Sequence, residues 1–317
     1  MQKVSVQCIV GAVSVTCLLS VNILLSITAF LGNSLILVAL HKESSLHPPS
    51  KLLYRCLATT DLLAGLLAHP LVASLWISVV HEHWSICRFV LDASLATSYV
   101  LHSVSLMTTT AISVDRLLAW LLGLRYKQIV NLKRIYMALA LFWVVPCIDT
   151  LFFLFVPHIR PWLGPIIIPS CLVISVASYI KIFRTLSRQQ AQIQDHVQQQ
   201  SSQPNALNMA RCKKTMYSAL WVQLALVVCY VPLSIVLLLI THTKTYSPLL
   251  MVIREIAITF AYLNSTLNPF LYCWKIHEVR RAVKQIIRQI IIIIIQYLYS
   301  AISIAIFNSA LQFIYNN

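Results

Sequence analysis

Asp61 is the clearest ionisable residue inside a long apolar run, Leu57-Ala-Thr-Thr-Asp-Leu-Leu-Ala-Gly-Leu-Leu. A charge at the middle of a bilayer costs about 2.5–3.5 kcal/mol on insertion scales, so this carboxylate needs inward-facing partners. Polar side chains stand at matching depth in other apolar runs, namely Asn33, Ser105, Asn264 and Asn268. A carboxylate among neutral oxygens suits a small cation, a proton relay or water. The alternative is a polar core that holds helices together, and the residues alone divide these interpretations evenly.

Asp115 and Arg116 form a second ionisable pair, at the end of the run that holds Ser105. Ser105 and Arg116 are eleven residues apart, close to three helical turns, so they project from one helix face at different depths. Two later runs carry internal prolines, Pro232 and Pro269. Because an internal proline removes a backbone hydrogen bond and bends a helix, we expect hinges at both positions.

Apolar helices must position these residues, because apolar runs dominate the chain. Of its 317 residues, 59% are hydrophobic and 10% are charged, and the mean hydropathy of +0.78 indicates a membrane protein. A helix needs about 20 apolar residues to cross the hydrocarbon core. The expected fold is all-α, a seven-helix transmembrane bundle over 14–274 that follows a short tail, 1–13. The seven expected spans are 14–40, 52–80, 89–121, 135–157, 165–186, 213–241 and 249–273.

Basic residues are distributed unevenly between the connections. An excess of 24 Lys and Arg over 9 Asp and Glu would suggest nucleic-acid binding in a soluble protein. In a membrane protein it is explained by orientation, so no nucleic-acid partner is expected. Nineteen of the 24 basic residues fall in 42–55, 116–134, 181–214 and 275–288. By the positive-inside rule, these segments are cytoplasmic and the amino terminus is extracellular.

Three segments outside the expected spans have distinct compositions. Segment 187–210 is rich in glutamine and is expected to be a long intracellular loop. Segment 289–317 has no charged residue, and we hypothesise that this apolar tail is not genuine and derives from translated non-coding sequence. Segment 275–288 predicts a short amphipathic helix on the cytoplasmic surface, in contact with membrane lipids. Its apolar stripe is Ile276, Val279, Val283 and Ile287.

One motif per expected helix, in order, gives the chain a family resemblance from about Ser26 to Arg288. The motifs are Gly32-Asn33, Leu57-Ala-x-x-Asp61, Asp115-Arg116-Leu117, Trp143, Tyr179, Cys229-x-x-Pro232 and Asn268-Pro-x-x-Tyr272. With these motifs the chain resembles the rhodopsin-like (class A) G protein-coupled receptors.

The resemblance implies a plasma-membrane receptor that binds an extracellular ligand and activates heterotrimeric G proteins, with arrestin as a further partner. It implies no cofactor except Na⁺ as an allosteric ion. The implied sodium pocket is Asp61, Ser105, Asn264 and Asn268. The implied G-protein contact and activation switch is Asp115, Arg116, Tyr179, Tyr230, Pro232, Pro269 and Tyr272.

Several positions depart from the family pattern. Tyr230 stands where the family usually has tryptophan, and Leu117 replaces the usual tyrosine after Asp115-Arg116. Segment 211–214 is purely basic, so the usual acidic partner of Arg116 is missing there. We therefore hypothesise elevated basal activity. A cysteine-free segment 156–165 and a missing span-five proline place the chain loosely nearest the melanocortin-related branch.

The family comparison also argues against three ligand classes. Amine, retinal and adenosine receptors would need Asp, Lys and Asn where this chain has Ser98, Tyr262 and Leu237. A small apolar molecule, a lipid and a cationic peptide remain open, because the expected cavity is aromatic with few charges. The ligand-pocket candidates are Asp92, Ser98, Tyr99, His102, Asp149, Glu255 and Tyr262.

Other functional classes have less support in the sequence. A small-solute transporter would need paired mid-membrane charges in corresponding halves, and no inverted repeat is visible. An enzyme is not expected, since no nucleophile–base pair and no metal-ligand set is spaced for chemistry. A seven-helix membrane protein that does not signal is the third alternative, because of Leu117, Tyr230 and the unusual tail.

Overall fold

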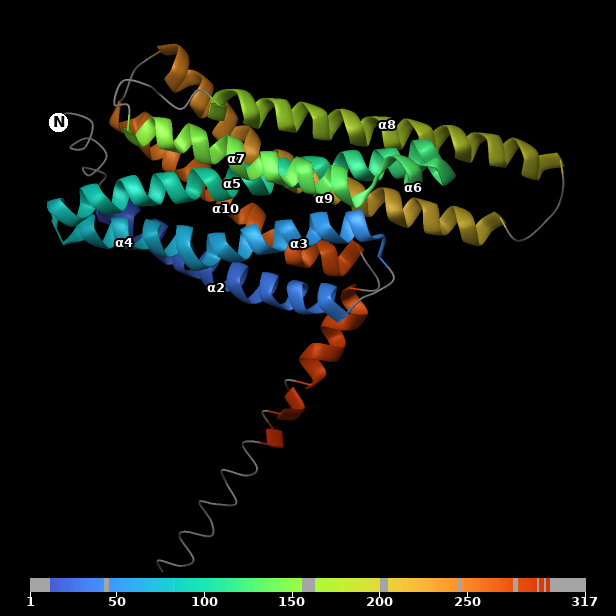
Figure 1. The fold of residues 1–317 in the computed structure, drawn as a ribbon, viewed down its shortest axis with the longest axis horizontal. Helices are drawn as coiled ribbons and strands as arrows, with labels where there is room; N and C mark the ends of the chain where they lie inside the picture. The colour runs from blue at the N-terminus through green and yellow to red at the C-terminus, as the bar shows by residue number, and fades with distance from the viewer. Residues whose placement is uncertain are drawn as a thin grey trace, which may run out of the picture.

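A computed structural model shows a bundle of seven long helices that run side by side (Figure 1). It describes residues 12–42, 46–81, 83–155, 163–199, 205–243, 247–275, 279–289, 291–293 and 295–296, and no strand occurs among them. The elements are α2 (Ala12–Lys42), α3 (Pro48–Leu63), the π-helical turn η1 (Ala64–Ala68), α4 (His69–Val80), α5 (Trp84–Leu122), the 3-10 turn η2 (Gly123–Arg125), α6 (Tyr126–Ile129), α7 (Leu132–Phe155), α8 (Leu163–Gln199), α9 (Asn205–Thr243) and α10 (Pro248–Lys275). The all-α seven-helix bundle predicted from the sequence is therefore confirmed.

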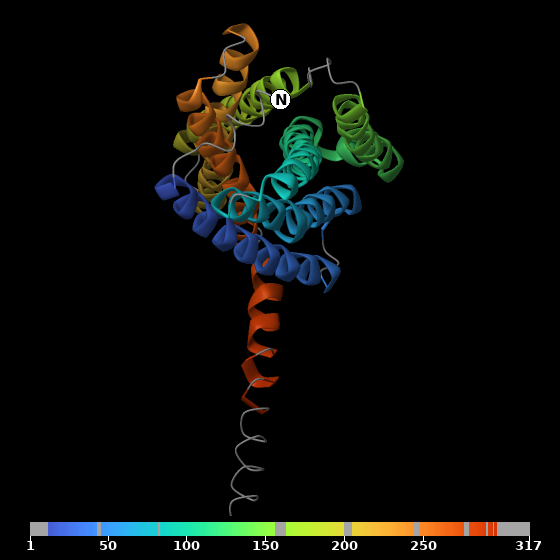
Figure 2. The same cartoon turned by 90° about the vertical axis from the view of Figure 1, so that its left-hand side faces the viewer.

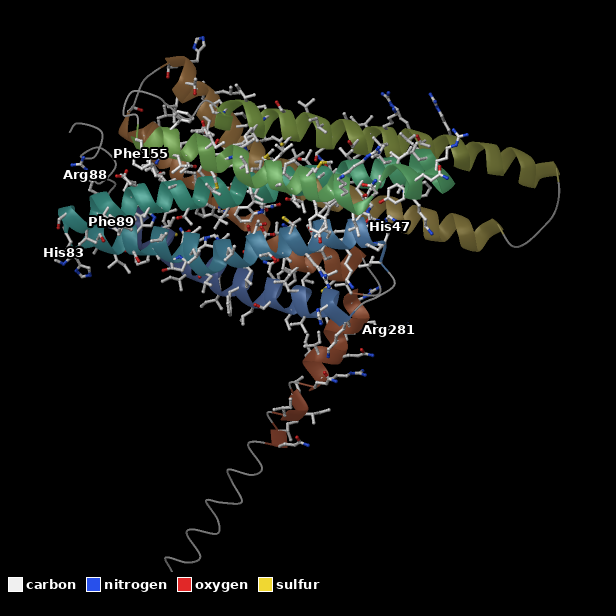
Figure 3. All side chains as sticks on the ribbon, in the orientation of Figure 1. His47, His83, Arg88, Phe89, Phe155 and Arg281 are labelled. Atoms are coloured by element: carbon white, nitrogen blue, oxygen red, sulfur yellow. The ribbon has the colours of Figure 1, made fainter. Side chains whose placement is uncertain are left out.

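Six of the described helical segments are long and apolar enough to cross a membrane by length and composition. The seventh long helix, α10, covers the expected span 249–273 but carries Arg254 and Glu255 in its first turns. The bundle has two ends, which Figure 3 marks with labelled side chains. We call the end with His47 and Arg281 the basic end, and the end with His83, Arg88 and Phe155 the far end.

The outer surface of the bundle is apolar, and its interior holds polar side chains among apolar ones. Large hydrophobic side chains such as Leu24, Leu141 and Val173 are exposed on its outer surface, whereas Asn33 and Asp61 are fully buried. This distribution fits a protein whose outer surface meets lipid, because polar groups must then find partners between the helices. Helix α5 occupies a central place, since it packs against α3, α4, α7 and α8 (Figure 2).

Two glycines permit close helix approaches in this interior. A Cβ at Gly65, in η1, would lie 2.9 Å from the backbone nitrogen of Phe30, and the Gly65 carbonyl accepts a 2.6 Å hydrogen bond from Ser26 Oγ. A Cβ at Gly32 would lie 2.9 Å from Cγ of Pro269. The glycines therefore let α2 touch both the π-helical turn and the proline of α10.

The glutamine-rich segment 187–210 differs from the expected long loop. Helix α8 continues to Gln199 and α9 begins at Asn205, so both helices extend beyond the bundle at its basic end (Figure 1). Glutamine, alanine, leucine and arginine are good helix formers, and a polar helix needs no packing partner when water surrounds it. The high polarity of this segment therefore did not indicate a loop.

A further helical segment, 279–289, follows α10 and packs on the basic end, where Val279, Ala282 and Ile286 are buried in one cluster with Leu40 and Tyr54. The expected stripe was partly wrong, because Ile287 is exposed and Val283 only half-buried. The buried stripe is shifted by one residue from the expected one, because Ala282 and Ile286 are buried in place of Val283 and Ile287. Ile276, residues 1–11 and residues 297–317 lie outside the described residues, so the predictions for both tails stay predictions.

Candidate functional sites

Asp61 accepts three hydrogen bonds from side chains of two other helices. Its Oδ1 accepts from Ser105 Oγ of α5 at 2.8 Å and from Ser265 Oγ of α10 at 2.9 Å. Its Oδ2 accepts from Asn268 Nδ2 of α10 at 2.7 Å. The Asp61 side chain is fully buried, so the cluster compensates a carboxylate that would otherwise be very costly at this depth.

The structure therefore brings together Asp61, Ser105 and Asn268, three of the four predicted sodium-pocket residues. Asn264, the fourth, is buried one turn along α10, and its Nδ2 has no hydrogen-bond partner among the described residues. Ser265 takes the expected place of Asn264 and was missed. Its spacing of three residues from Asn268, on one helical face, was the available signal.

Asn33 joins the same region by a backbone contact. Its Nδ2 donates to the carbonyl oxygens of Ala29 and Ser265, at 2.8 and 3.0 Å. The cluster thus links α2, α3, α5 and α10 through polar groups. Its hydroxyl oxygens can donate to Asp61, as they do here, or turn a lone pair toward a cation, which is the chemistry expected of a small-cation site.

Tyr230, at the position of the family's tryptophan, lies on α9 next to Pro232. Its side chain is almost fully buried among Leu106, Cys171 and Ala261, and its hydroxyl has no hydrogen-bond partner among the described residues. Tyr230 therefore packs at the junction of α5, α8, α9 and α10.

Asp115 is the centre of a second polar cluster, at the basic end. Its carboxylate accepts from Ser50 Oγ at 2.9 Å and from the Tyr126 hydroxyl at 2.5 Å, and Arg116 Nη2 lies 3.5 Å from it. Burial and the Asp115 hydrogen bond raise the pKa of Tyr126 to about 12, so this phenol stays protonated and donates at neutral pH. Ser50 and Tyr126 were not predicted as site residues.

Arg116 is held by tyrosine rather than by an acid on α9. Its guanidinium carbon lies 5.6 Å from the centre of the Tyr54 ring, and the Tyr54 ring contacts the Tyr272 ring edge-on at 5.0 Å. Tyr179 is buried on α8. The structure thus links Arg116 to the predicted switch residue Tyr272 through Tyr54, which the sequence analysis missed.

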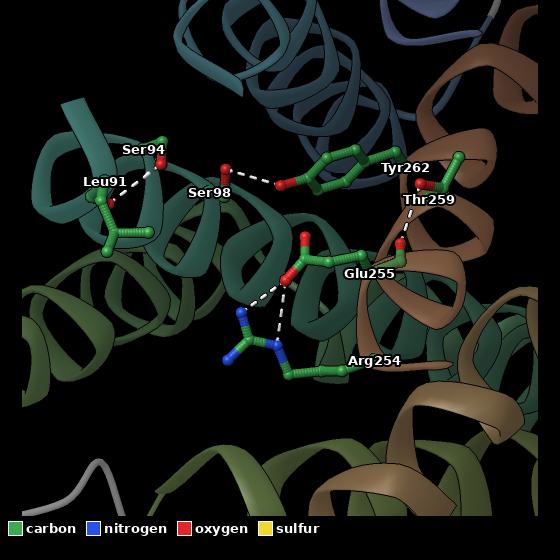
Figure 4. Close-up of polar contacts among 7 residues, drawn as sticks. All are labelled: Leu91, Ser94, Ser98, Arg254, Glu255, Thr259 and Tyr262. Carbon is green, nitrogen blue, oxygen red and sulfur yellow. Dashed lines mark hydrogen bonds and ion pairs between the residues drawn. The ribbon is translucent and has the colours of Figure 1, made fainter. Parts of the chain in front are cut away.

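Five of the seven ligand-pocket candidates take part in three contacts near the far end, and Figure 4 shows two of these, Tyr262 with Ser98 and Glu255 with Arg254. The Tyr262 hydroxyl donates to Ser98 Oγ at 2.8 Å, which joins α10 to α5. The Tyr99 hydroxyl donates to Asp149 Oδ2 at 2.7 Å, which joins α5 to α7.

The third contact is an ion pair. Arg254 Nε lies 3.1 Å from Glu255 Oε1, and Nη2 of the same arginine also contacts that oxygen. Asp92 is exposed and lies outside these three contacts among the described residues. Arg254 therefore neutralises Glu255.

His102 lies with His69 and Tyr262 in one aromatic group. The His102 and Tyr262 rings stack at 4.5 Å, and the His69 ring meets Tyr262 edge-on at 4.8 Å. His69, the first residue of α4, is fully buried and was not predicted.

Seven long helices, a buried carboxylate cluster between them and an arginine at one end of the third span define a seven-helix membrane receptor. The sequence pattern described as "7 transmembrane receptor (rhodopsin family)" matches residues 32–161 and 162–272. The chain belongs to this family, and it is a G protein-coupled receptor. Receptors of this family are not enzymes.

Individual relatives agree with that assignment. The chain is 24% identical over 304 residues to trace amine-associated receptor 1 of Homo sapiens, an alignment that covers 85% of the chain and 87% of the relative. It is 25% identical over 288 residues to adenosine receptor A3 of Ovis aries, which covers 82% and 86%. It is 24% identical over 311 residues to the high-affinity lysophosphatidic acid receptor of Xenopus laevis, which covers 83% and 79%. Nearness to the melanocortin-related branch stays a prediction.

Proposed function

We propose that the basic end of the bundle is cytoplasmic and that Arg116 is the residue through which this receptor contacts its G protein. The observation that carries the proposal is the environment of Arg116, whose side chain is 31% exposed at the basic end and, among the described residues, contacts Asp115 and the Tyr54 ring. A ligand at the far end would shift the equilibrium toward an open basic end, where Arg116 leaves the Tyr54 ring.

The distribution of charge supports this orientation in the plasma membrane. The basic segments 42–55, 116–134, 181–214 and 275–288 all connect or follow helices at the basic end. Cytoplasmic segments of membrane proteins carry such an excess of Lys and Arg. The far end and the amino terminus are then extracellular, and arrestin is proposed as a second partner at the basic end.

Na⁺ is proposed as an allosteric ion at Asp61. The support is the fully buried carboxylate with two serine hydroxyls and one amide within 2.9 Å of it, oxygens and nitrogens from three helices in one cluster. A cation there would tie α3, α5 and α10 together and oppose the opening of the basic end. Asn264 is not in direct contact with Asp61, so Ser265 replaces it in the proposed ligand set.

The proposed ligand is small and largely uncharged. Two of the acids in the pocket are already engaged, Asp149 with Tyr99 and Glu255 with Arg254. Ser98 accepts the Tyr262 hydroxyl where an amine receptor would offer a carboxylate. The names of the relatives include amine, adenosine and lysophosphatidic acid receptors, and the engaged acids favour a neutral or lipid ligand over a cationic peptide.

Basal G-protein activation tests the role of Arg116. Cells that express the wild type or Arg116→Ala at equal surface level are compared across G-protein subtypes, and we expect a wild-type signal that the substitution abolishes. Lys133→Ala, which removes another basic residue at the same end, is the matched control and should keep the signal. A wild-type signal that survives in Arg116→Ala would contradict the proposal. If the wild type gives no basal signal, the same pair is compared in a ligand screen.

A further inference from the structure

Three imidazole nitrogens between α4 and α5 are buried and have no hydrogen-bond partner in the part of the chain that the structure describes. They are Nδ1 and Nε2 of His69 and Nε2 of His102. The side chains are 0% and 9% exposed, so water at the protein surface does not satisfy these atoms. A buried polar atom without a partner is costly, and such atoms in a native protein call for a ligand, an ion or internal water.

The hydrogen bond of His102 decides which of its nitrogens is available. Its Nδ1 lies 2.8 Å from the carbonyl oxygen of Ser98, which can only accept a hydrogen bond. In the neutral ring Nδ1 therefore carries the proton, and Nε2 keeps its lone pair. This is the arrangement of metal-binding histidines, which commonly donate the other ring N–H to a carbonyl oxygen that fixes the ring.

The spacing of the two rings also suits a shared metal ion. Zinc lies about 2.0–2.1 Å from a histidine nitrogen and hence about 3.2 Å from the ring centre, so two rings that share one zinc have centres at most about 6.4 Å apart. The ring centres of His69 and His102 are 6.2 Å apart, with the ring planes at 84°. The observed distance lies just inside that limit. An angle of about 109° at tetrahedral zinc corresponds to about 5.2 Å between the ring centres, so the rings would approach each other by about 1 Å when they bind the ion.

The surroundings hold both rings in place. Tyr262 stacks on His102 and meets His69 edge-on, while its hydroxyl is fixed on Ser98. The π-helical turn η1 ends at Ala68, so the backbone irregularity directly precedes His69 and sets the direction of its side chain. Such turns are frequent at functional sites.

From these observations we propose that His69 and His102 form a binding site for a divalent transition-metal ion of the zinc type, between α4 and α5. The described residues contain no group of three or more His, Cys, Asp or Glu side chains placed around one ion. The site is therefore a two-histidine site, in which water or a bound anion supplies the other ligands. Neutral imidazole prefers such ions to Mg²⁺ or Ca²⁺.

A titration of the purified receptor with ZnCl₂ tests the site without any assumption about signalling. The full chain, without a polyhistidine tag, is heated in detergent over a series of Zn²⁺ concentrations, with MgCl₂ as the comparison ion. We expect a saturable rise in Tm with Zn²⁺ and none with Mg²⁺. The rise should be lost in His69→Ser and in His102→Ser. His69→Cys, nearly the same size as the serine variant, restores a metal ligand and should recover the rise.

The far end provides a matched control. His81 and His83 are exposed, and their ring centres are 6.3 Å apart, so they are the nearest competitor for added zinc. The double variant His81→Ser/His83→Ser should keep the Tm rise. The proposal is overturned if the wild type shows no Zn²⁺-specific rise in Tm. It is also overturned if that rise survives in both single serine variants, or if the double variant His81→Ser/His83→Ser loses it. An equal change of Tm with Zn²⁺ in His69→Cys and His69→Ser would also overturn the proposal.

Discussion

Replacement of Tyr54 by leucine should raise the basal activity of this receptor. In the structure Tyr54 provides the ring under the Arg116 guanidinium and packs edge-on against Tyr272. In the proposed activation, Arg116 leaves this ring as the basic end opens, and the contact with Tyr272 is lost with it. Leucine keeps most of the apolar volume in the buried cluster around Leu40 and Leu57 but removes both aromatic contacts.

The size of the effect follows from the two contacts. A cation–π contact at a partly exposed site contributes about 0.5–1 kcal/mol, and the Arg116 side chain is 31% exposed. An aromatic edge contact contributes about 0.5–1.5 kcal/mol. Loss of both shifts the closed–open equilibrium by about 1–2.5 kcal/mol, so the open population should rise at least about fivefold.

Basal nucleotide exchange on the G protein measures this shift, in membranes with equal amounts of surface receptor. Tyr54→Phe keeps the ring and should stay close to the wild type. Tyr136→Leu removes an exposed tyrosine of α7 and serves as the matched control. The reasoning is refuted if Tyr54→Leu leaves basal exchange unchanged, or if Tyr54→Phe raises it as much. The double variant with Arg116→Ala should be silent, which separates a true gain of activity from altered expression.

Three further perturbations address the other clusters. Asp61→Asn keeps the side-chain shape but removes the charge. Basal nucleotide exchange by the wild type should therefore differ between NaCl and choline chloride, whereas exchange by the variant should be the same in both salts. Equal responses of the two proteins to Na⁺ would exclude Asp61 as the ion site. Tyr126→Phe removes a hydrogen bond to a carboxylate, which is worth about 1.5–3 kcal/mol, so its Tm should fall relative to Tyr136→Phe.

Because the pKa of Tyr126 is raised to about 12, its stabilising contribution is fully present below the unfolded pKa of about 10. It should be lost as the pH rises from there toward 12, and the Tm difference between Tyr126→Phe and the wild type should shrink over the same range. Gly65→Val should abolish surface expression, because its first side-chain atom already meets the Phe30 backbone at 2.9 Å. Gly123→Ala, where nothing lies within 4 Å of the added atom but φ is +50°, should be tolerated better.

The spans could be predicted from the sequence because a single physical requirement, about 20 apolar residues per crossing, acts on each helix separately. The connections could not be predicted in this way, because polar residues such as those of 187–199 are compatible both with a loop and with a helix that projects into water. Helical periodicity also failed to give the correct buried stripe of 279–289. Which face is buried there depends on the cluster formed by α2, α3 and α10, a property of the assembled bundle.

The site residues show the same difference between features of a single helix and features of the assembled bundle. Asp61, Ser105 and Asn268 were predicted because a charge in a span demands partners. Ser265, Ser50 and Tyr54 were missed because serine and tyrosine are unremarkable in a span until another helix brings a carboxylate or a guanidinium beside them. His69 was missed for the same reason, since its significance appears only when α5 places His102 at a ring distance of 6.2 Å.

Segment 211–214 has no acidic residue that could restrain Arg116, and contacts from other helices replace that restraint. A receptor without an acid on α9 to restrain Arg116 needs another source of closed-state stability, and the described contacts supply it from α3 and α6. Tyr54 contacts the guanidinium, while Tyr126 and Ser50 hold the neighbouring Asp115. None of these three contacts depends on α9, so an outward movement of α9 would leave them intact. If the proposed role of Arg116 is correct, its displacement from the Tyr54 ring is a step separate from any movement of α9, and the Tyr54 variant tests that step.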